Sequence, residues 1–304
     1  DPADPGRAHP FYRLEDGMTV AESCKRYIWF WPVAVLLLAA AYAPIYPRMV
    51  RAWLADPNYS HGFLVPIVAA WFAYGRLPEI RNLEARPDFR GLVLMAFGLL
   101  LLFAGTAVGE LFTSRVSALF LLAGALHALW GSRVMRLLAL PLAYLVFMIP
   151  LPYTVYDMLA MPLKSLVSWS AAGGLKLFGL PVLREGNLII FPNITLEVVD
   201  ACSGLRSLTS LIALGVAYAF LFLKRPWQRV VLTLATVPIA VLTNALRVFI
   251  TGLLARHAGA AAAEGFFHDF AGMAVFLMAL ALTALTGFLL GRLPEKRKGG
   301  PDAP

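Results

Sequence analysis

The stretch ACSGLRSLTSLIALGVAYAFLFL, residues 201–223, joins a short polar segment to a long apolar run. The apolar part, 203–223, has the length and character of a membrane-crossing helix, which needs about 20 mainly apolar residues. Four polar or reactive residues stand at its beginning: Asp200, Cys202, Ser203 and Arg206. A thiol beside a guanidinium at the entrance to such a run indicates a reactive group placed at a membrane surface.

The composition of the whole chain supports a membrane location. Hydrophobic residues make up 60% of the 304 residues and charged residues only 14%, whereas ordinary soluble domains contain about 25% charged residues. The mean hydropathy is +0.71. The net charge of +8 does not indicate nucleic-acid binding, because the basic residues fall in short gaps between apolar runs. There they set the topology and meet anionic lipid headgroups.

The apolar runs predict the fold class: an all-α polytopic membrane protein with about eight transmembrane helices. We expect a flexible cytoplasmic tail over residues 1–26, a single membrane-embedded domain over 27–293, and a basic cytoplasmic tail over 294–304. The expected spans are 27–47, 62–76, 91–109, 115–131, 134–150, 203–223, 230–255 and 267–291.

The stretch 151–201 differs from the rest. We expect a helix over 155–179 that lies in the interface or enters the membrane only in part, because a full crossing would place Lys224, Arg225 and Arg229 outside, against the positive-inside rule. NLIIF (187–191) and TLEVV (195–199) then predict a short extracytoplasmic β-hairpin.

This topology brings three reactive side chains to one depth. Cys202 precedes the sixth span at its outer end, Arg247 comes 18 residues after Arg229 in the seventh span, and His268 opens the eighth. Eighteen helical residues rise about 27 Å, close to the outer edge of a hydrocarbon core of about 30 Å. The sequence therefore predicts a thiol, a guanidinium and an imidazole at the outer rim of the membrane.

The seventh span carries a polar stripe that includes Asn244 and Arg247. Its six members are Thr233, Thr236, Thr243, Asn244, Arg247 and Thr251. A charged side chain in a span is expensive and usually faces the bundle interior or water, so Arg247 is a functional candidate. The alternative is that Arg247 snorkels toward the interface or caps a partner helix.

Cys202 is either a small buried hydrophobic residue or a nucleophile. A helix N-terminus and the neighbouring Arg206 both favour its thiolate. His61, in YSHGF, competes with His268 for the role of the base, and Ser203 is a possible serine nucleophile. We expect no metal and no cofactor, since the chain has no zinc-type ligand spacing and no phosphate-binding glycine motif.

At these residues the sequence resembles the exosortase/archaeosortase family of integral-membrane cysteine transpeptidases. The motifs that carry the resemblance are ACSGLRSL (201–208), TNALRVFITG (243–252) and GFFHDFAG (265–272), in that order. Three shorter pieces support it: YSHGF (59–63), IPLPY (149–153) and GLPVLREGN (179–187). The resemblance covers about residues 55–290, and His268 favours the bacterial branch, because the archaeal branch has a second arginine there.

The resemblance implies catalysis by Cys202, Arg247 and His268, with Arg206, Asn244, Ser203 and His61 in supporting or substrate-binding positions. It implies a bacterial inner-membrane enzyme whose active site faces the extracytoplasmic side. Its substrates would be secreted proteins that end in a short Pro-containing (PEP-like) motif, a hydrophobic helix and a basic tail, and it is often linked to exopolysaccharide genes. The acceptor is open, either water or an amine. The alternative is a non-enzymatic lipid or polysaccharide carrier in an export assembly, in which Arg206 and Arg247 bind a phosphate headgroup.

Overall fold

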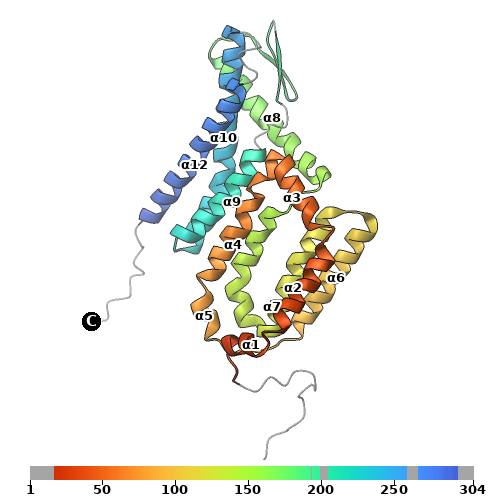
Figure 1. The fold of residues 1–304 in the computed structure, drawn as a ribbon. Coiled ribbons are helices and arrows are strands. Elements are labelled where there is room, and N and C mark those ends of the chain that lie inside the picture. Colours follow the sequence, from red (N-terminus) through yellow and green to blue (C-terminus); the bar gives the residue numbers. More distant parts are fainter. Residues whose placement is uncertain (1–16, 193, 199–204, 259–265, 294–304) are drawn as a thin grey trace, which may run out of the picture. The chain divides into compact units, whose positions relative to one another are not determined.

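The computed structural model describes residues 17–192, 194–198, 205–258 and 266–293. The chain divides into two compact units, Asp1–Pro152 and Tyr153–Pro304, and Figure 1 shows the elements of each. Each unit is built around helices.

The first unit consists of helices joined by short connections. Its elements are α1 (Val20–Arg26), α2 (Phe30–Tyr42), α3 (Tyr46–Ala55), the 3-10 helix η1 (Pro57–Phe63), α4 (Leu64–Tyr74), α5 (Leu77–Arg81), α6 (Arg90–Val108), α7 (Leu111–Tyr144) and the 3-10 helix η2 (Leu145–Met148).

Helices α6 and α7 approach each other closely along a row of glycines. Gly91, Gly98 and Gly105 are buried on α6 at a spacing of seven residues. A Cβ at Gly98 would stand 3.0 Å from Leu121 Cγ, and one at Gly105 would stand 2.5 Å from Ser114 Oγ. Small residues let helix backbones approach where lipid removes the hydrophobic driving force between helices. The row therefore explains why these two helices pair.

Helix α7 is interrupted at Gly131, where φ is 80° and ψ is −174°. Residues with a side chain rarely adopt this conformation, and a Cβ at Gly131 would also collide with the carbonyl oxygen of Arg86. The interruption lies where the sequence predicts the end of one span (115–131) and the start of the next (134–150). The first expected span thus lies in α7 up to Gly131, and the second comprises the rest of α7 together with η2.

The second unit combines helices with a small sheet. Its helices are α8 (Tyr153–Leu177), α9 (Leu205–Phe222), α10 (Pro226–Ala258) and α12 (Phe266–Arg292), and its strands are β1 (Leu183–Glu185), β2 (Leu188–Ile190) and β3 (Thr195–Glu197). The strands form an antiparallel sheet in the order β1-β2-β3. The predicted hairpin corresponds to β2 and β3, and β1 is an addition that the sequence analysis did not predict.

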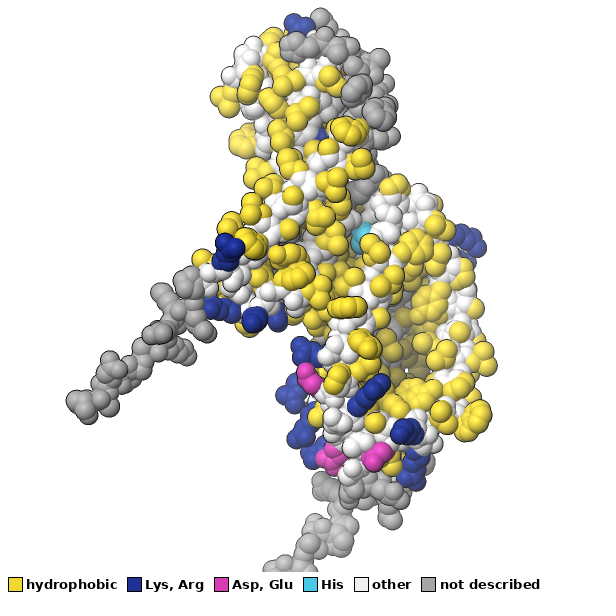
Figure 2. Space-filling view, turned by 60° about the vertical axis from the view of Figure 1, so that its left-hand side comes forward, with side chains coloured by type: hydrophobic (Ala, Val, Ile, Leu, Met, Phe, Trp, Pro, Cys, Tyr) yellow, Lys and Arg dark blue, Asp and Glu magenta, His cyan; other side chains and the backbone are white. Residues whose placement is uncertain are grey.

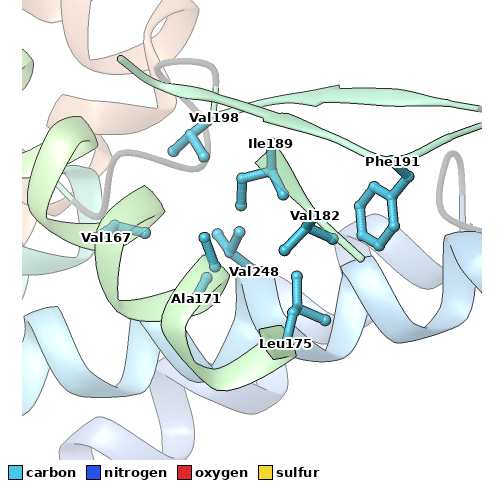
Figure 3. Packing of buried hydrophobic residues seen from close by; sticks show 9 residues of the cluster. Val167, Ala171, Leu175, Val182, Ile189, Phe191, Val198 and Val248 are labelled. Atoms are coloured by element: carbon cyan, nitrogen blue, oxygen red, sulfur yellow. The ribbon is translucent and has the colours of Figure 1, made fainter. Parts of the chain in front are cut away.

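A hydrophobic core joins this sheet to α8 and α10 (Figure 3). Ile189 and Val198 from the sheet are almost completely buried against Leu175 of α8 and Val248 of α10. Gly186, at φ 61°, makes the two-residue turn from β1 to β2, a position that favours glycine. The sheet is therefore fixed on the C-terminal half of α10, beside Arg247.

Four helical segments of the described chain are long and apolar enough to cross a membrane: Arg90–Val108, Leu111–Met148, Pro226–Arg256 and Phe270–Arg292. Helices α1 and α2 pass the same test only as a pair, bent by 82°. If this pair is one span, the described chain has five candidate spans. The expected count of about eight spans is not confirmed. Three reasons are visible: α7 contains two expected spans, α4 has only 11 residues, and the apolar helix Ser207–Phe222 is too short.

Helix α8 has 25 residues and is not among those segments; its partial entry into the membrane stays a prediction. Hydrophobic side chains cover much of the helix surface seen in Figure 2. Ion pairs such as Arg76–Glu79 and Arg86–Glu84 are exposed in the connection between α4 and α6. Apolar side chains on the helix surfaces, with charged residues in the connections, are the pattern of a multi-pass membrane protein.

Candidate functional site

The polar stripe of the sequence lies on the inner face of α10. Thr236, Thr243 and Asn244 are buried, with Asn244 only 2% exposed. The opposite face carries exposed apolar side chains, namely Val231, Leu234, Val237, Leu242, Leu246 and Ile250. Both threonine hydroxyls donate to backbone carbonyls one turn earlier, those of Thr233 and Ile239. The stripe thus lies on the side of α10 opposite its exposed apolar face. Asn244 comes one helical turn before Arg247 on this side.

Arg247 is half-buried, and its guanidinium lies against the backbone of α12. A Cβ built on Gly272 would stand 3.1 Å from Nη2 and 3.3 Å from Cζ of Arg247. A Cβ at this separation would crowd the planar guanidinium, which would have to shift by a few tenths of an ångström. The guanidinium of Arg247 therefore lies between α10 and α12.

A groove of about 350 Å³ opens beside Arg247. It is lined by Arg247, Ile250, Thr251 and Leu254 from α10 and by Phe270, Ala271, Ala274 and Val275 from α12. Among the described residues of this lining Arg247 is the charged one, and Thr251 adds a hydroxyl one turn further along α10. An apolar groove with a few converging polar groups is the usual form of a ligand site.

The remaining expected site residues of this unit are defined less fully. Cys202 and Ser203 lie outside the described residues. Arg206 belongs to the first turn of α9 and His268 to the first turn of α12, but their side chains are not among those described. His268 precedes Gly272 by four residues, about one helical turn. The backbone of α12 therefore brings the position of His268 to within one turn of the guanidinium of Arg247.

His61 belongs to η1 in the first unit. Its burial lowers the pKa of the imidazole below the ordinary value, and hydrogen bonds to the backbone of Phe147 and Asn58 oppose this shift. Trp53 Nε1 donates to the carbonyl oxygen of Met148 at 2.8 Å, and the hydroxyl of Tyr59 forms a hydrogen bond with the backbone of Leu151. The Tyr59 contact ties YSHGF to the IPLPY segment, and the Trp53 and His61 contacts tie the same region to η2. His61 therefore has a structural task in its own unit. Its expected part in substrate binding stays a prediction.

The described residues contain no group of three or more His, Cys, Asp or Glu side chains that could hold a metal ion. One residue of the site was not predicted from the sequence, namely Gly272. Because it has no side chain, the guanidinium of Arg247 can lie against the backbone of α12. The signal was present, because Gly272 ends the motif GFFHDFAG, but its role depends on how α10 and α12 meet.

The fold and this site define an α-helical membrane protein with an arginine held between two helices beside an apolar groove. A family model described as transmembrane exosortase (Exosortase_EpsH) matches residues 53–285, which is most of the chain. The chain therefore belongs to the exosortase family, as the sequence motifs indicate. No curated protein and no solved structure matches it.

Proposed function

We propose that this exosortase family member is a membrane-embedded cysteine protease or transpeptidase that removes the C-terminal sorting signal of secreted proteins. The observation that carries the proposal is the placement of Arg247 against Gly272 of α12, next to the groove and one turn from His268. Family membership supports a membrane transpeptidase in general. The residues Cys202, Arg247 and His268 are our assignment.

In the first step the Cys202 thiolate attacks the scissile carbonyl carbon and forms a carbon–sulfur bond. The negative charge that develops on the carbonyl oxygen is stabilised by the positively charged guanidinium of Arg247, which donates hydrogen bonds and does not act as the base. The carbon–nitrogen bond then breaks, and protonated His268 gives its proton to the departing amine. The products of this step are a thioester on Cys202 and a released C-terminal segment.

In the second step neutral His268 takes the proton of the acceptor, and the acceptor attacks the thioester. The carbon–sulfur bond breaks, which restores the Cys202 thiolate and protonated His268. Water as the acceptor gives a carboxylic acid, and an amine gives a new peptide-like bond. Arg206, Asn244 and Ser203 would support the three groups, and Asn244 is buried one turn from Arg247.

The proposed location is the bacterial inner membrane, with the site on the extracytoplasmic side. A substrate with its own membrane helix would meet the site by lateral movement in the bilayer, and this confinement raises the effective concentration of its scissile bond. The partners would be such secreted proteins, membrane lipid and the acceptor.

The thioester provides the test. The purified full-length protein in lipid nanodiscs is incubated with a reporter, a tagged protein that ends in a Pro-Glu-Pro motif, an apolar helix and an Arg-rich tail. We expect a covalent adduct on Cys202 by mass spectrometry, and its release by hydroxylamine. Cleavage of the reporter without any adduct, or an adduct on another residue, would contradict the mechanism.

Gly272 gives a second test that is based on described contacts. Gly272→Ala places a Cβ 3.1 Å from Nη2 of Arg247, so the guanidinium has to shift by a few tenths of an ångström and reporter cleavage should slow only slightly. Gly272→Val forces a larger shift, and a misplacement of about 1 Å can lower a rate about a hundredfold. The measurement is the cleavage rate at equal protein level in the membrane.

Gly291, on the same helix, supplies the control for the Gly272 series. A Cβ there meets only Leu223 Cδ2, at 3.6 Å, an ordinary contact. Gly291→Ala and Gly291→Val should therefore cleave at the native rate. Native activity in Gly272→Val would show that the position of the Arg247 guanidinium against Gly272 has no part in catalysis.

A further inference from the structure

Strand β3 is an edge of the small sheet. It pairs with β2 on one side, with Leu188, Ile189 and Ile190 opposite Glu197, Leu196 and Thr195. Within the described residues no strand pairs with its other side. A strand edge of this kind offers unpaired backbone donors and acceptors to an extended peptide.

The hydrogen-bond register shows which residues of β3 offer their backbone groups to that open side. Phe191 N–H donates to the carbonyl of Ile194 at 2.8 Å, and Val198 N–H donates to the carbonyl of Asn187 at 2.9 Å. In an antiparallel pair, alternate residues direct both backbone groups toward the same neighbour. Ile194 and Val198, and Leu196 between them, therefore face β2. Thr195 and Glu197 direct their N–H and C=O groups to the open side.

Side-chain burial agrees with this alternation. Ile194 and Leu196 pack against the core between the sheet and the helices, and Val198 belongs to that core. Thr195 and Glu197 have exposed side chains. The inward residues thus anchor β3, which leaves an edge with two outward-facing residues.

This edge leads directly to the proposed site. Val198, the residue after β3, is 1% exposed and shares a core with Val248 of α10, the neighbour of Arg247 in the sequence. Cys202 follows Val198 by four residues, so its Cα lies within about 14 Å of that of Val198, since an extended chain spans at most about 3.5 Å per residue. A peptide that continues along β3 past Val198 would therefore run toward the part of α10 that carries Arg247.

We propose that the open edge of β3 binds the extended segment of the substrate beside the scissile bond, by adding it to the sheet as a fourth strand. This inference rests on the proposed function. Its occupant is a peptide in β conformation, held through the N–H and C=O groups of Thr195 and Glu197. Recognition through the backbone orients the scissile carbonyl toward the site and leaves most side chains of the segment unspecified.

The same geometry sets a rule for the substrate. Residues that direct their N–H toward β3 need that donor, while the residues between them direct theirs away. Proline, which has no N–H, is therefore tolerated at every second position of the bound segment and excluded at the others.

The first experiment removes one backbone donor from the edge. Glu197→Pro deletes an outward N–H at an edge position where proline fits. Glu197→Ala keeps the N–H and removes the same side chain, including its 3.3 Å contact with Asn187. We expect the proline variant to cleave the reporter about tenfold more slowly than the alanine variant, as for one lost hydrogen bond. Equal rates would overturn the proposal.

The opposite edge of the sheet supplies the matched control. Leu188 and Ile190 of β2 direct their backbone groups toward β1, where Glu185 and Leu183 lie opposite them. By the same alternation, Arg184 directs its backbone groups away from β2, at the outer edge of β1. Arg184→Pro and Arg184→Ala should cleave the reporter at rates within about twofold of each other. A slow Arg184→Pro variant would show that proline harms the sheet as such, and the crosslinking experiment then decides.

The crosslinking experiment does not depend on a proline variant. Thr195→Cys, in a background of Cys24→Ala and Cys202→Ala, is oxidised with single-cysteine reporters. Neighbouring strands of a sheet lie about 4.8 Å apart, so a reporter cysteine opposite Thr195→Cys is within the range for a disulfide. We expect a disulfide with a reporter cysteine next to the motif and none from Arg184→Cys in the same background. No crosslink from Thr195→Cys would overturn the proposal.

The failure of this inference can be told from the failure of the proposed function. If Cys202→Ala stops cleavage while Glu197→Pro equals Glu197→Ala and Thr195→Cys forms no crosslink, the edge has no role but the protease remains. If Cys202→Ala cleaves normally, the proposed function fails whatever the edge does.

Discussion

Replacement of the proposed nucleophile, Cys202→Ala, is expected to lower the cleavage rate of the reporter by at least about a thousandfold. Without the thiol no thioester forms, and removal of a catalytic nucleophile typically leaves only the small residual rate that comes from binding and charge stabilisation. The rate is measured by the loss of the C-terminal tag in membranes with equal amounts of enzyme. Cys24 lies in α1, outside the proposed site, so Cys24→Ala should keep the native rate.

The outcome of Cys202→Ala also separates the protease from the carrier hypothesis. A carrier that binds a phosphate headgroup needs its arginines and has no use for the thiol. Full cleavage by Cys202→Ala would contradict the protease. If Arg247→Ala then abolished export while Cys202→Ala did not, the carrier would be the better account.

Replacement of Arg247 is expected to have the second largest effect. Arg247→Ala removes the group that stabilises the developing oxyanion, and loss of one such donor lowers a rate about a hundredfold to a thousandfold. Arg247→Lys retains the positive charge but not the planar guanidinium that lies against Gly272, so we expect a loss of at least about tenfold. The measurement is the single-turnover rate of thioester formation on Cys202.

Arg256 supplies the control for Arg247. It lies on the same helix, nine residues further on, and is exposed. Arg256→Ala should form the thioester at the native rate. A native rate in Arg247→Ala would remove the guanidinium from the mechanism.

The sequence predicted those features that depend on local pattern. The polar stripe on 230–255 is the buried face of α10, because a 3.6-residue period decides which side chains share a face. The runs 187–191 and 195–199 contain β2 and β3, because both are β-rich and flank a turn. The first strand was missed, although Gly186-Asn187 is a recognised hairpin signal.

Features that depend on tertiary approach were not predictable in this way. The spacing between α10 and α12 decides that Arg247 meets Gly272, and no local pattern contains that spacing. The count of about eight spans is not confirmed for a related reason, since hydropathy does not reveal how α7 continues past Gly131 or that α4 has only 11 residues. The convergence of Cys202, Arg247 and His268 stays a prediction.

The central claim is that Cys202 and His268 lie close enough to share a proton and a substrate. The most direct test is chemical crosslinking in the native membrane. His268→Cys, in a Cys24→Ala background, is treated with a short bifunctional thiol reagent, and the bridge to Cys202 is quantified by peptide mass spectrometry. Thr286→Cys, about 27 Å further along α12, is the control. The account predicts a bridge in most molecules of His268→Cys and none in the control. No bridge in either variant would contradict it.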